Sequence, residues 1–583
     1  MELLYVWIEK FRNINNKGFN FSNQYDLYYD SASNQIKINL IDGSSAMTNQ
    51  NGILNFNTDK SNYLEDFFNS DSSEAISEIS QITAIIGKNS SGKSNVIDFI
   101  LTAISRGSRD RINSTNYVLI FKKNDKPYFW GKTEGNSLPN SKIKSLGIPV
   151  EKINPSAQWE TMFYSNVADN KEYVFENSTV NNCSFEAMNK LQSNKIRFVD
   201  SDIFDDTWKK LNPGNNPERK VRFIFNPVAF SELEKSHAEE DKISGILKRY
   251  RKAIYQESTS NYNRFKYGLA INLFSFLVSK SVGMDQFLEL VQLVGQEGMA
   301  EAIATLNPKI LNYLNQIDTS QIEDLSELDY RLYNNLLQEL EVSNYNFGEV
   351  ERNSNSILVD FNEDFKTLIG EKQNVFNNPS LISHDWSKLS SGMRAYLNLY
   401  SQLYSVGEKI RGNSKSVLIC IDEGDLYLHP EWQKNFLNDL IWFIPNVFES
   451  SKVQIILTSH SPFLISDLPK ENVILLDENC HPTRQLNEES SFGANIHQLF
   501  TRQFFLTSGS IGEFAKRKIT SLLNDIKEMT DDNVEQFQKR VDMIGEPVLR
   551  FRLEDELKKR LKELSKETQI KWHELEISKL SAS

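Results

Sequence analysis

Cysteine and histidine are scarce in this chain of 583 residues, and neither is spaced as a metal or nuclease site. The three cysteines, Cys183, Cys420 and Cys480, lie far apart and match no zinc or redox motif. We therefore expect a reducing, cytoplasmic setting, with Cys420 buried in an apolar strand. The seven histidines are scattered, which leaves no His-Asn-His nuclease cluster in the sequence.

Long apolar runs and an excess of positive charge are also missing. Residues 1–6 lack a basic stretch followed by an apolar one, so we expect no export signal. The longest apolar-looking stretch, 267–282, is broken by polar residues and predicts no membrane span. A formal charge of −13 argues against general affinity for nucleic acid and restricts any such contact to a local patch. The sequence contains no sustained heptad repeat, so we expect no long coiled-coil arm.

The spacing of apolar residues divides the chain into four parts. Residues 1–170 are rich in the alternation typical of strands, whereas 171–375 mainly show the recurrence at three and four typical of helices. Residues 376–500 alternate helix and strand, which predicts a parallel sheet with crossovers, and 501–583 are helical and charged. We therefore predict an α/β fold, a mixed sheet with helices, that carries an inserted helical lobe and a helical tail.

The most specific motif is GKNSSGKS, residues 87–94, which fits the phosphate-binding pattern G-x-x-x-x-G-K-[ST]. An apolar run over 82–86 predicts a strand before it, and 95–100 predicts a helix after it. The glycines let backbone N–H groups face one centre, where the helix N-terminus adds partial positive charge. The alternative, an ordinary Gly/Ser turn, is disfavoured by these flanking elements.

This loop predicts that the chain binds a nucleoside triphosphate. The Lys93 ammonium would reach the outer phosphates, and the Ser94 hydroxyl would ligate magnesium. The predicted nucleotide-binding residues are Gly87, Lys88, Asn89, Ser90, Ser91, Gly92, Lys93, Ser94 and Asn95.

An acidic pair, Asp422 and Glu423, ends the apolar run that begins at residue 417. A run of this kind is typical of a strand buried on both faces, which delivers its last residues to the ligand-binding edge of an open α/β sheet. Asp422 would hold magnesium through water, and Glu423 would act as the general base. Such a pair is common by itself, and the phosphate loop upstream favours this interpretation.

Two further candidate site motifs lie at the ends of predicted helices or strands. Ser390, Ser391 and Gly392 open a helix, either as an anion-binding end or as a plain helix cap. His460 follows another apolar strand, 453–457, where it could hydrogen-bond a γ-phosphate oxygen. A lone histidine is more often structural, but this one ends a third strand of the same predicted sheet.

In this order, the motifs GKNSSGKS, LSSGM, LICIDEGDLYLHP and TSHSPF resemble those of the ABC-type ATPases of the RecF/SMC/OLD branch. The resemblance implies an ABC-ATPase head that uses ATP and Mg²⁺, with Lys93, Glu423 and His460 as catalytic residues. In this family two heads enclose two ATP molecules, which implies a homodimer or a higher even-numbered homo-oligomer and slow hydrolysis. The segment 424–430 would sense the second subunit's site, or would simply be a turn closed by proline.

The same resemblance concerns five more positions. Ser390, Ser391 and Gly392 of one subunit would close on the γ-phosphate held by the other. Met393 stands where the family usually has Glu or Gln, and Asn166 occupies the place of the Q-loop, whose glutamine this chain lacks.

The tail is similar to the PtuA-type ATPase subunits of Septu and retron anti-phage defence systems, through the motifs FGANIH (492–497), GEFA (512–515) and IGEP (544–547). This resemblance implies a regulatory subunit that controls an HNH-type nuclease supplied in trans and docked on 501–583. The alternative for the tail is a helical cap on the head. Since no Asp-x-Asp pair of a Toprim nuclease follows His460, we expect ATPase as the activity of this chain.

One stretch interleaves cations with aromatic residues, an arrangement that can follow phosphates and stack bases. The cations are Lys248, Arg249, Arg251 and Lys252. A contact with DNA or RNA, retron msDNA included, is one interpretation, and a solvated helix face with its aromatics in the core is the other. The alternative function is a RecF/SMC-like DNA-repair or DNA-clamping ATPase, which the missing coiled coil disfavours.

Overall fold

The structure of the chain is a computed structural model. It describes residues 1–23, 25–30, 35–40, 67–69, 78–105, 109–124, 126–132, 144–145, 148–149, 151–167, 179–184, 192–211, 220–225, 245–250, 252–254, 260–279, 285, 287–289, 292, 299–316, 335–340, 356–371, 382–386, 389–412, 416–483, 490–496, 499 and 511–582.

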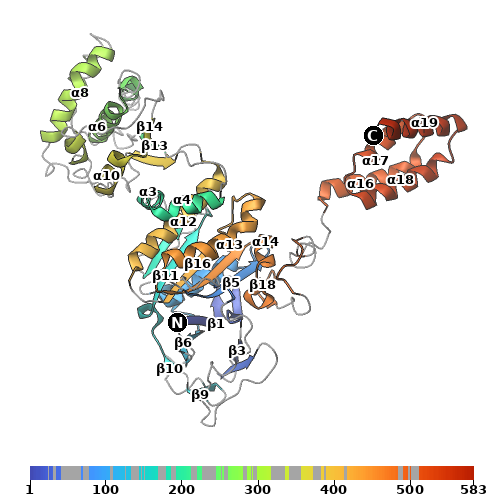
Figure 1. The fold of residues 1–583 in the computed structure, drawn as a ribbon, viewed down its shortest axis with the longest axis horizontal. Helices are drawn as coiled ribbons and strands as arrows, with labels where there is room; N and C mark the ends of the chain where they lie inside the picture. The colour runs from blue at the N-terminus through green and yellow to red at the C-terminus, as the bar shows by residue number, and fades with distance from the viewer. Residues whose placement is uncertain are drawn as a thin grey trace. The chain divides into compact units, whose positions relative to one another are not determined.

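A seven-stranded sheet with the order β12-β11-β16-β17-β5-β18-β19 forms the centre of the head (Figure 1). All neighbouring strands pair in parallel except β18 and β19. The strands are β5 (Glu78–Gly87), β11 (Trp159–Ser165), β12 (Val180–Ser184), β16 (Ser416–Asp422), β17 (Lys452–Ser459), β18 (Val473–Leu476) and β19 (Pro482–Thr483). The predicted α/β fold with a parallel sheet is confirmed. Because parallel strands end at one edge, the residues that follow β5, β11, β16 and β17 meet there.

A second sheet covers the helix that follows the phosphate loop. Its order is β10-β7-β6-β1-β2, from β1 (Glu2–Phe11), β2 (Ile14–Asn20), β6 (Tyr117–Lys123), β7 (Lys126–Lys132) and β10 (Glu151–Lys152). Helix α1 (Lys93–Ile104) is apolar almost all round, and ten of its twelve residues are buried. It shares one hydrophobic core with Val6 of β1 and with Leu418 of β16, so it packs against both sheets.

The Asp98 carboxylate on α1 is fully buried in this core and pairs with two arginines. The Arg12 guanidinium lies 2.7 Å from it and the Arg111 guanidinium 3.1 Å.

We expect Asp98→Ala to lower the free energy of unfolding by about 2–4 kcal/mol, at or below the range for breaking a buried ion pair, because both arginines still reach water. Urea denaturation followed by fluorescence measures this loss. The exposed Asp532→Ala is the control, and a loss under about 1 kcal/mol contradicts the ion-pair account.

The remaining elements up to residue 496 include a small antiparallel sheet with the order β14-β13-β15. Its strands are β13 (Lys220–Phe225), β14 (Ser356–Asp360) and β15 (Ile382–Trp386). The part predicted as mainly helical, 171–375, therefore also contains strands, because short apolar runs do not distinguish a strand from a buried helix. The helices are α3 (Gln192–Val199), α4 (Asp202–Leu211), α6 (Asn261–Ser279), α8 (Met299–Gln316), α10 (Glu363–Glu371), α12 (Ser391–Ile410), α13 (Pro430–Val447) and α14 (Pro462–Ser466). The short strands are β3 (Tyr25–Asp30), β4 (Gln35–Leu40), β8 (Lys144–Ser145) and β9 (Ile148–Pro149).

Contacts divide the chain into two compact units, 1–496 and 497–583. The second unit consists of α16 (Glu513–Asp525), α17 (Val534–Asp542), α18 (Pro547–Leu561) and α19 (Lys566–Ala582) (Figure 1). These helices enclose a hydrophobic core of their own, which includes Phe537, Leu557 and Trp572. Short 3-10 helices complete the assignment at Arg109–Ile112, Pro155–Ala157, Lys470–Asn472 and Ile526–Glu528.

Within the described ranges, every helix is either too short or too polar to cross a lipid bilayer.

Candidate functional site

The phosphate loop connects the end of β5 to the start of α1. A Cβ atom on Gly87 would lie 2.8 Å from the carbonyl oxygen of Leu476. At Gly92, where φ is +95°, a Cβ atom would lie 2.7 Å from Cys480 Sγ and 2.9 Å from Asn13 Oδ1. Neither position accepts a side chain without displacing its neighbours, so these two glycines are required for the backbone to curl.

Lys93, the first residue of α1, turns its ammonium group back into the loop. Its Nζ donates to the carbonyl oxygens of Gly87 at 3.1 Å and Lys88 at 3.2 Å, and lies 2.9 Å from His460 Nε2. Burial lowers the pKa of Lys93, and the Glu423 carboxylate, the next-largest influence, opposes that shift. The loop thus holds a buried cation in contact with two carbonyl oxygens and a histidine, with the carboxylates of Glu423 and Asp422 nearby. A desolvated cation of this kind favours binding of an anion.

Asp422 and Ser94 meet beside this cation. Ser94 Oγ donates to Asp422 Oδ1 at 2.9 Å, and Thr458 Oγ1 donates to the same oxygen at 2.5 Å. The Asp422 carboxylate is buried and stands opposite Thr458 in the register of β16 and β17. Hydroxyl and carboxylate oxygens are the ligands that Mg²⁺ prefers, so the donor set fits this cation.

Glu423 differs from its neighbour in backbone and in exposure. Its φ of +50° lies in the left-handed region, which is unusual for a residue other than glycine. Its side chain is 24% exposed, and its Oε1 lies 3.5 Å from His460 Nε2. Two hydrogen bonds hold the turn, from the Glu423 N–H to Thr458 Oγ1 at 3.0 Å and to the Thr458 carbonyl oxygen at 3.1 Å. The carboxylate therefore reaches the accessible part of the site while its backbone is fixed.

Thr458 and Asp425 were not among the predicted site residues. Thr458 holds both members of the acidic pair, as described above. Asp425 is buried, accepts from Ser459 Oγ at 2.6 Å and has a raised pKa, chiefly because of burial. Their signal in the sequence is a polar residue directly at or after the end of an apolar strand, which by itself does not distinguish a structural contact from a ligand.

Ser390, Ser391 and Gly392, which we call the signature, stand at the start of helix α12 (Ser391–Ile410). Ser390 Oγ accepts from the Met393 N–H at 3.2 Å, so the helix-cap interpretation is realised. Ser390 and Ser391 are exposed, whereas Gly392 is buried and a Cβ atom on it would lie 3.2 Å from the Tyr427 carbonyl oxygen. In the described part of the chain, no hydrogen bond joins these three residues to the phosphate loop of the same subunit.

Asn166 follows β11, whose last residue, Ser165, pairs with Asp422. Its Oδ1 accepts from the Tyr164 hydroxyl at 2.6 Å, and the same hydroxyl lies 3.3 Å from the Ala395 carbonyl oxygen of α12. One hydroxyl proton serves only one of these acceptors at a time. The Asn166 amide nitrogen is buried and lacks a hydrogen-bond partner among the described residues, so a donor is available beside the acidic pair.

The cations at the start of the cation-rich stretch are exposed, whereas Arg264 and two of the aromatic residues are buried. Tyr250 and Phe265 are fully buried, which keeps them from stacking on bases. The exposed cations are Lys248, Arg249 and Lys252, and Arg251 lies outside the described residues. This arrangement fits a solvated helix face, and a contact between its cations and phosphates stays a prediction.

Comparisons with known proteins concern several parts of this chain. Residues 299–466 match the family model described as "AAA domain, putative AbiEii toxin, Type IV TA system". That match includes the signature, the acidic pair and His460, and it begins after the phosphate loop. Among solved structures, that of the recombination mediator protein RecF with ATP aligns over 82% of this chain and 97% of its own, at 12% identity and a TM-score of 0.22.

Two curated relatives match over shorter segments. A segment of 79 residues, 13% of this chain, is 33% identical to the "Retron Vc95 probable ATPase" of Vibrio cholerae serotype O1 biovar El Tor and covers 14% of it. A segment of 175 residues, 28% of this chain, is 26% identical to the "Septu protein PtuA" of Bacillus mycoides (strain KBAB4) and covers 23% of it. The aligned segments thus span less than a quarter of either relative. These matches confirm the resemblance inferred from the motifs: the chain contains an AbiEii-like ATPase domain of the AAA family, homologous over the aligned segments to Septu PtuA and to the retron Vc95 ATPase.

Proposed function

We propose that this chain is the ATP-binding and ATP-hydrolysing regulatory subunit of an anti-phage defence complex, and that it controls an HNH-type nuclease supplied in trans. The observation that carries the proposal is the meeting of Lys93, the Ser94–Asp422 pair and the Glu423–His460 pair at one edge of the sheet. The names of the relatives, a Septu protein and a retron ATPase, support the assignment to defence.

The residues of the site divide the work by their burial and charge. Lys93 neutralises the outer phosphates, and the backbone N–H groups of the loop orient them. Ser94 and Asp422 hold Mg²⁺, which supplies further neutralisation of phosphate charge when bound. Glu423 accepts the proton of the attacking water, and His460, 3.5 Å away, helps to orient that carboxylate.

A second copy of the chain completes the site. Ser390 and Ser391 are exposed at the start of α12, where their hydroxyls and the helix N-terminus can receive a phosphate from another subunit. Because the site is complete only in the closed pair, hydrolysis is slow. The nuclease docks on the tail, 501–583, whose helices have a core of their own and apolar side chains left on the surface.

Mixing two inactive variants tests the shared site. Lys93→Ala disables the phosphate loop and leaves the signature intact. Ser391→Arg, at an exposed position, blocks the signature and leaves the phosphate loop intact. We expect neither variant alone to hydrolyse ATP. Co-expressed with different tags at equal amounts, they should recover about a quarter of the wild-type rate, because half of the pairs are mixed and each mixed pair has one complete site out of two.

Pairs that carry Lys93→Ala in both copies are the control and should stay inactive. No recovery in the mixed sample, with both variants folded and associated, would show that the signature does not act on the partner's nucleotide. Full activity of Ser391→Arg alone would show the same.

A further inference from the structure

Exposed apolar side chains gather in the tail. Of the eleven large hydrophobic residues that are exposed in the described part of the chain, six belong to the second unit. They are Phe514, Met543, Val548, Phe551, Ile570 and Ile577. Groups of exposed apolar side chains on a protein surface often mark a site of interaction with another molecule.

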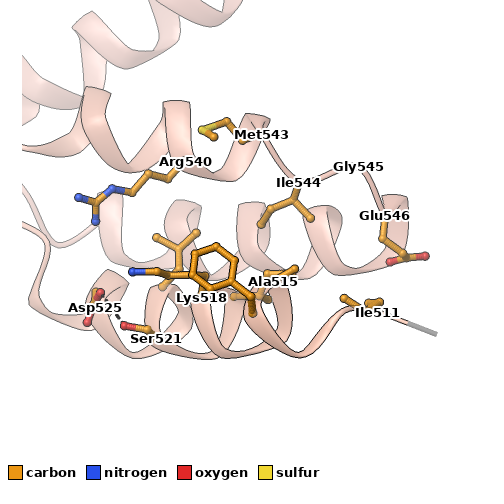
Figure 2. Close-up of a pocket in the computed structure, with 13 residues that line it drawn as sticks. Ile511, Ala515, Lys518, Ser521, Asp525, Arg540, Met543, Ile544, Gly545 and Glu546 are labelled. Atoms are coloured by element: carbon orange, nitrogen blue, oxygen red, sulfur yellow. Dashed lines mark hydrogen bonds between the residues drawn. The ribbon is translucent and has the colours of Figure 1, made fainter. Parts of the chain in front are cut away.

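Two of these residues belong to a groove between α16 and the end of α17, which we call the tail groove. Its volume is about 660 Å³, and Phe514 and Met543, 69% and 83% exposed, line it together with Ile544. Figure 2 shows Arg540 and Met543 on one side and Ala515, Lys518 and Ser521 on the other. The groove is thus an open apolar trough with charged residues at its margins.

Two more form a ridge that begins directly after the groove. Val548 and Phe551, each 72% exposed, are three residues apart on α18 and therefore share one face. That face is opposite the buried stripe of Leu553 and Leu557. Phe551 is five residues beyond Glu546, the last residue of the groove, which amounts to about 8 Å along a helix.

The charges at the groove and at the ridge are complementary. Glu546 lies at one end of the groove, and Lys518, Arg540 and Asp525 lie toward the other, which keeps a net positive charge (Figure 2). On α18, the exposed Arg552 follows the ridge directly, and the exposed Asp555 comes one turn later. A helix that runs in the groove in the same direction as α18, away from Glu546, would place Arg552 toward Glu546, and Asp555, which pairs with Lys559 on its own helix, toward the two cations.

We propose that the tail groove receives the Val548–Phe551 ridge of a second copy of this chain. Because groove and ridge are neighbours on the same unit, each copy supplies both, and the pairing is two-fold. This contact requires no nucleotide, and it keeps two heads together at high local concentration before ATP joins them. It is therefore separate from the closure of the heads described under the proposed function.

Sedimentation velocity of the full chain without nucleotide tests the pairing. The Lys93→Ala background removes any ATP-driven closure. We expect dimers in the micromolar range, and we expect Phe551→Asp or Met543→Asp to raise the dissociation constant roughly 30-fold or more, as for central interface residues. Ile570→Asp, at a position 59% exposed on α19 but outside the groove and the ridge, is the matched control and should leave the dimer unchanged.

A second measurement detects the contact directly. Copies with Met543→Cys and copies with Phe551→Cys are mixed and oxidised mildly, and we expect a disulfide between the two kinds of chain. The native cysteines are buried and give a low background. A monomeric chain at every concentration, or a dimer unaffected by Phe551→Asp, would overturn the inference, and either is the outcome if the nuclease is what occupies the groove. Recovery of activity in the mixing experiment would leave the proposed function intact in that case.

Discussion

Lys93→Ala should weaken ATP binding by roughly 30-fold to several thousand-fold, the range for truncating one partner of a buried charge pair. Lys93 is 5% exposed, and its ammonium is the charge that the loop aims at its own centre. Without it, the phosphates would face the carbonyl oxygens of Gly87 and Lys88, which are negative ends of dipoles. The loss is therefore a loss of attraction together with a gain of repulsion.

Titration calorimetry with ATP and Mg²⁺ at fixed ionic strength measures this effect. Lys434→Ala is the control, because its ion pair with Glu431 is exposed and should contribute little to any property. Circular dichroism establishes that the variant is folded. An affinity within about threefold of wild type, in a folded Lys93→Ala chain, would remove the phosphate loop from the nucleotide site.

Glu423→Gln should slow ATP hydrolysis by about 10²–10⁴-fold, the usual contribution of a general base. Glutamine has the same shape and keeps the side chain within reach of His460, but it cannot accept a proton at neutral pH. The affinity for ATP should stay within a few fold of wild type, because the substitution leaves the phosphate loop around Lys93 unchanged. The variant should therefore accumulate as a closed, ATP-loaded pair.

Single-turnover hydrolysis measures the first consequence, and light scattering with ATP in a Phe551→Asp background, which removes the tail pairing, measures the second. Glu431→Gln, an exposed acid at the start of α13, is the matched control and should behave as wild type. Equal turnover in wild type and Glu423→Gln would show that another group activates the water. Slow turnover without a closed pair would separate the chemistry from the association of the heads.

The edge of the sheet that carries the candidate site was predictable because its signals are local. The run 417–421 is apolar at every position, and such a run has few interpretations other than a buried strand. The strand fixes the direction of the chain, so Asp422 and Glu423 must lie at its carboxyl end. The phosphate loop has the same property, since its glycines, lysine and serine have fixed spacing.

Contacts between distant segments were not predictable from the same patterns. Arg12 and Arg111 both pair with Asp98, although the turn between β1 and β2 carries one of them and the 3-10 helix Arg109–Ile112 the other. Phe223 pairs with Ile357 in the small sheet, and the two strands are separated by more than a hundred residues of mainly helical sequence. The tail groove likewise depends on how α16 meets the end of α17, which no local spacing specifies.

The backbone conformation of Glu423 opposes stability to the proposed catalytic role at a single position. A left-handed conformation costs a residue with a side chain about 1–3 kcal/mol, whereas glycine adopts it freely. A glycine at this position would therefore make the chain harder to melt, and it would leave no carboxylate to take a proton from water. Selection for thermal stability alone would favour glycine at this position. An acid retained here would therefore indicate that stability is given up for a higher rate of ATP hydrolysis.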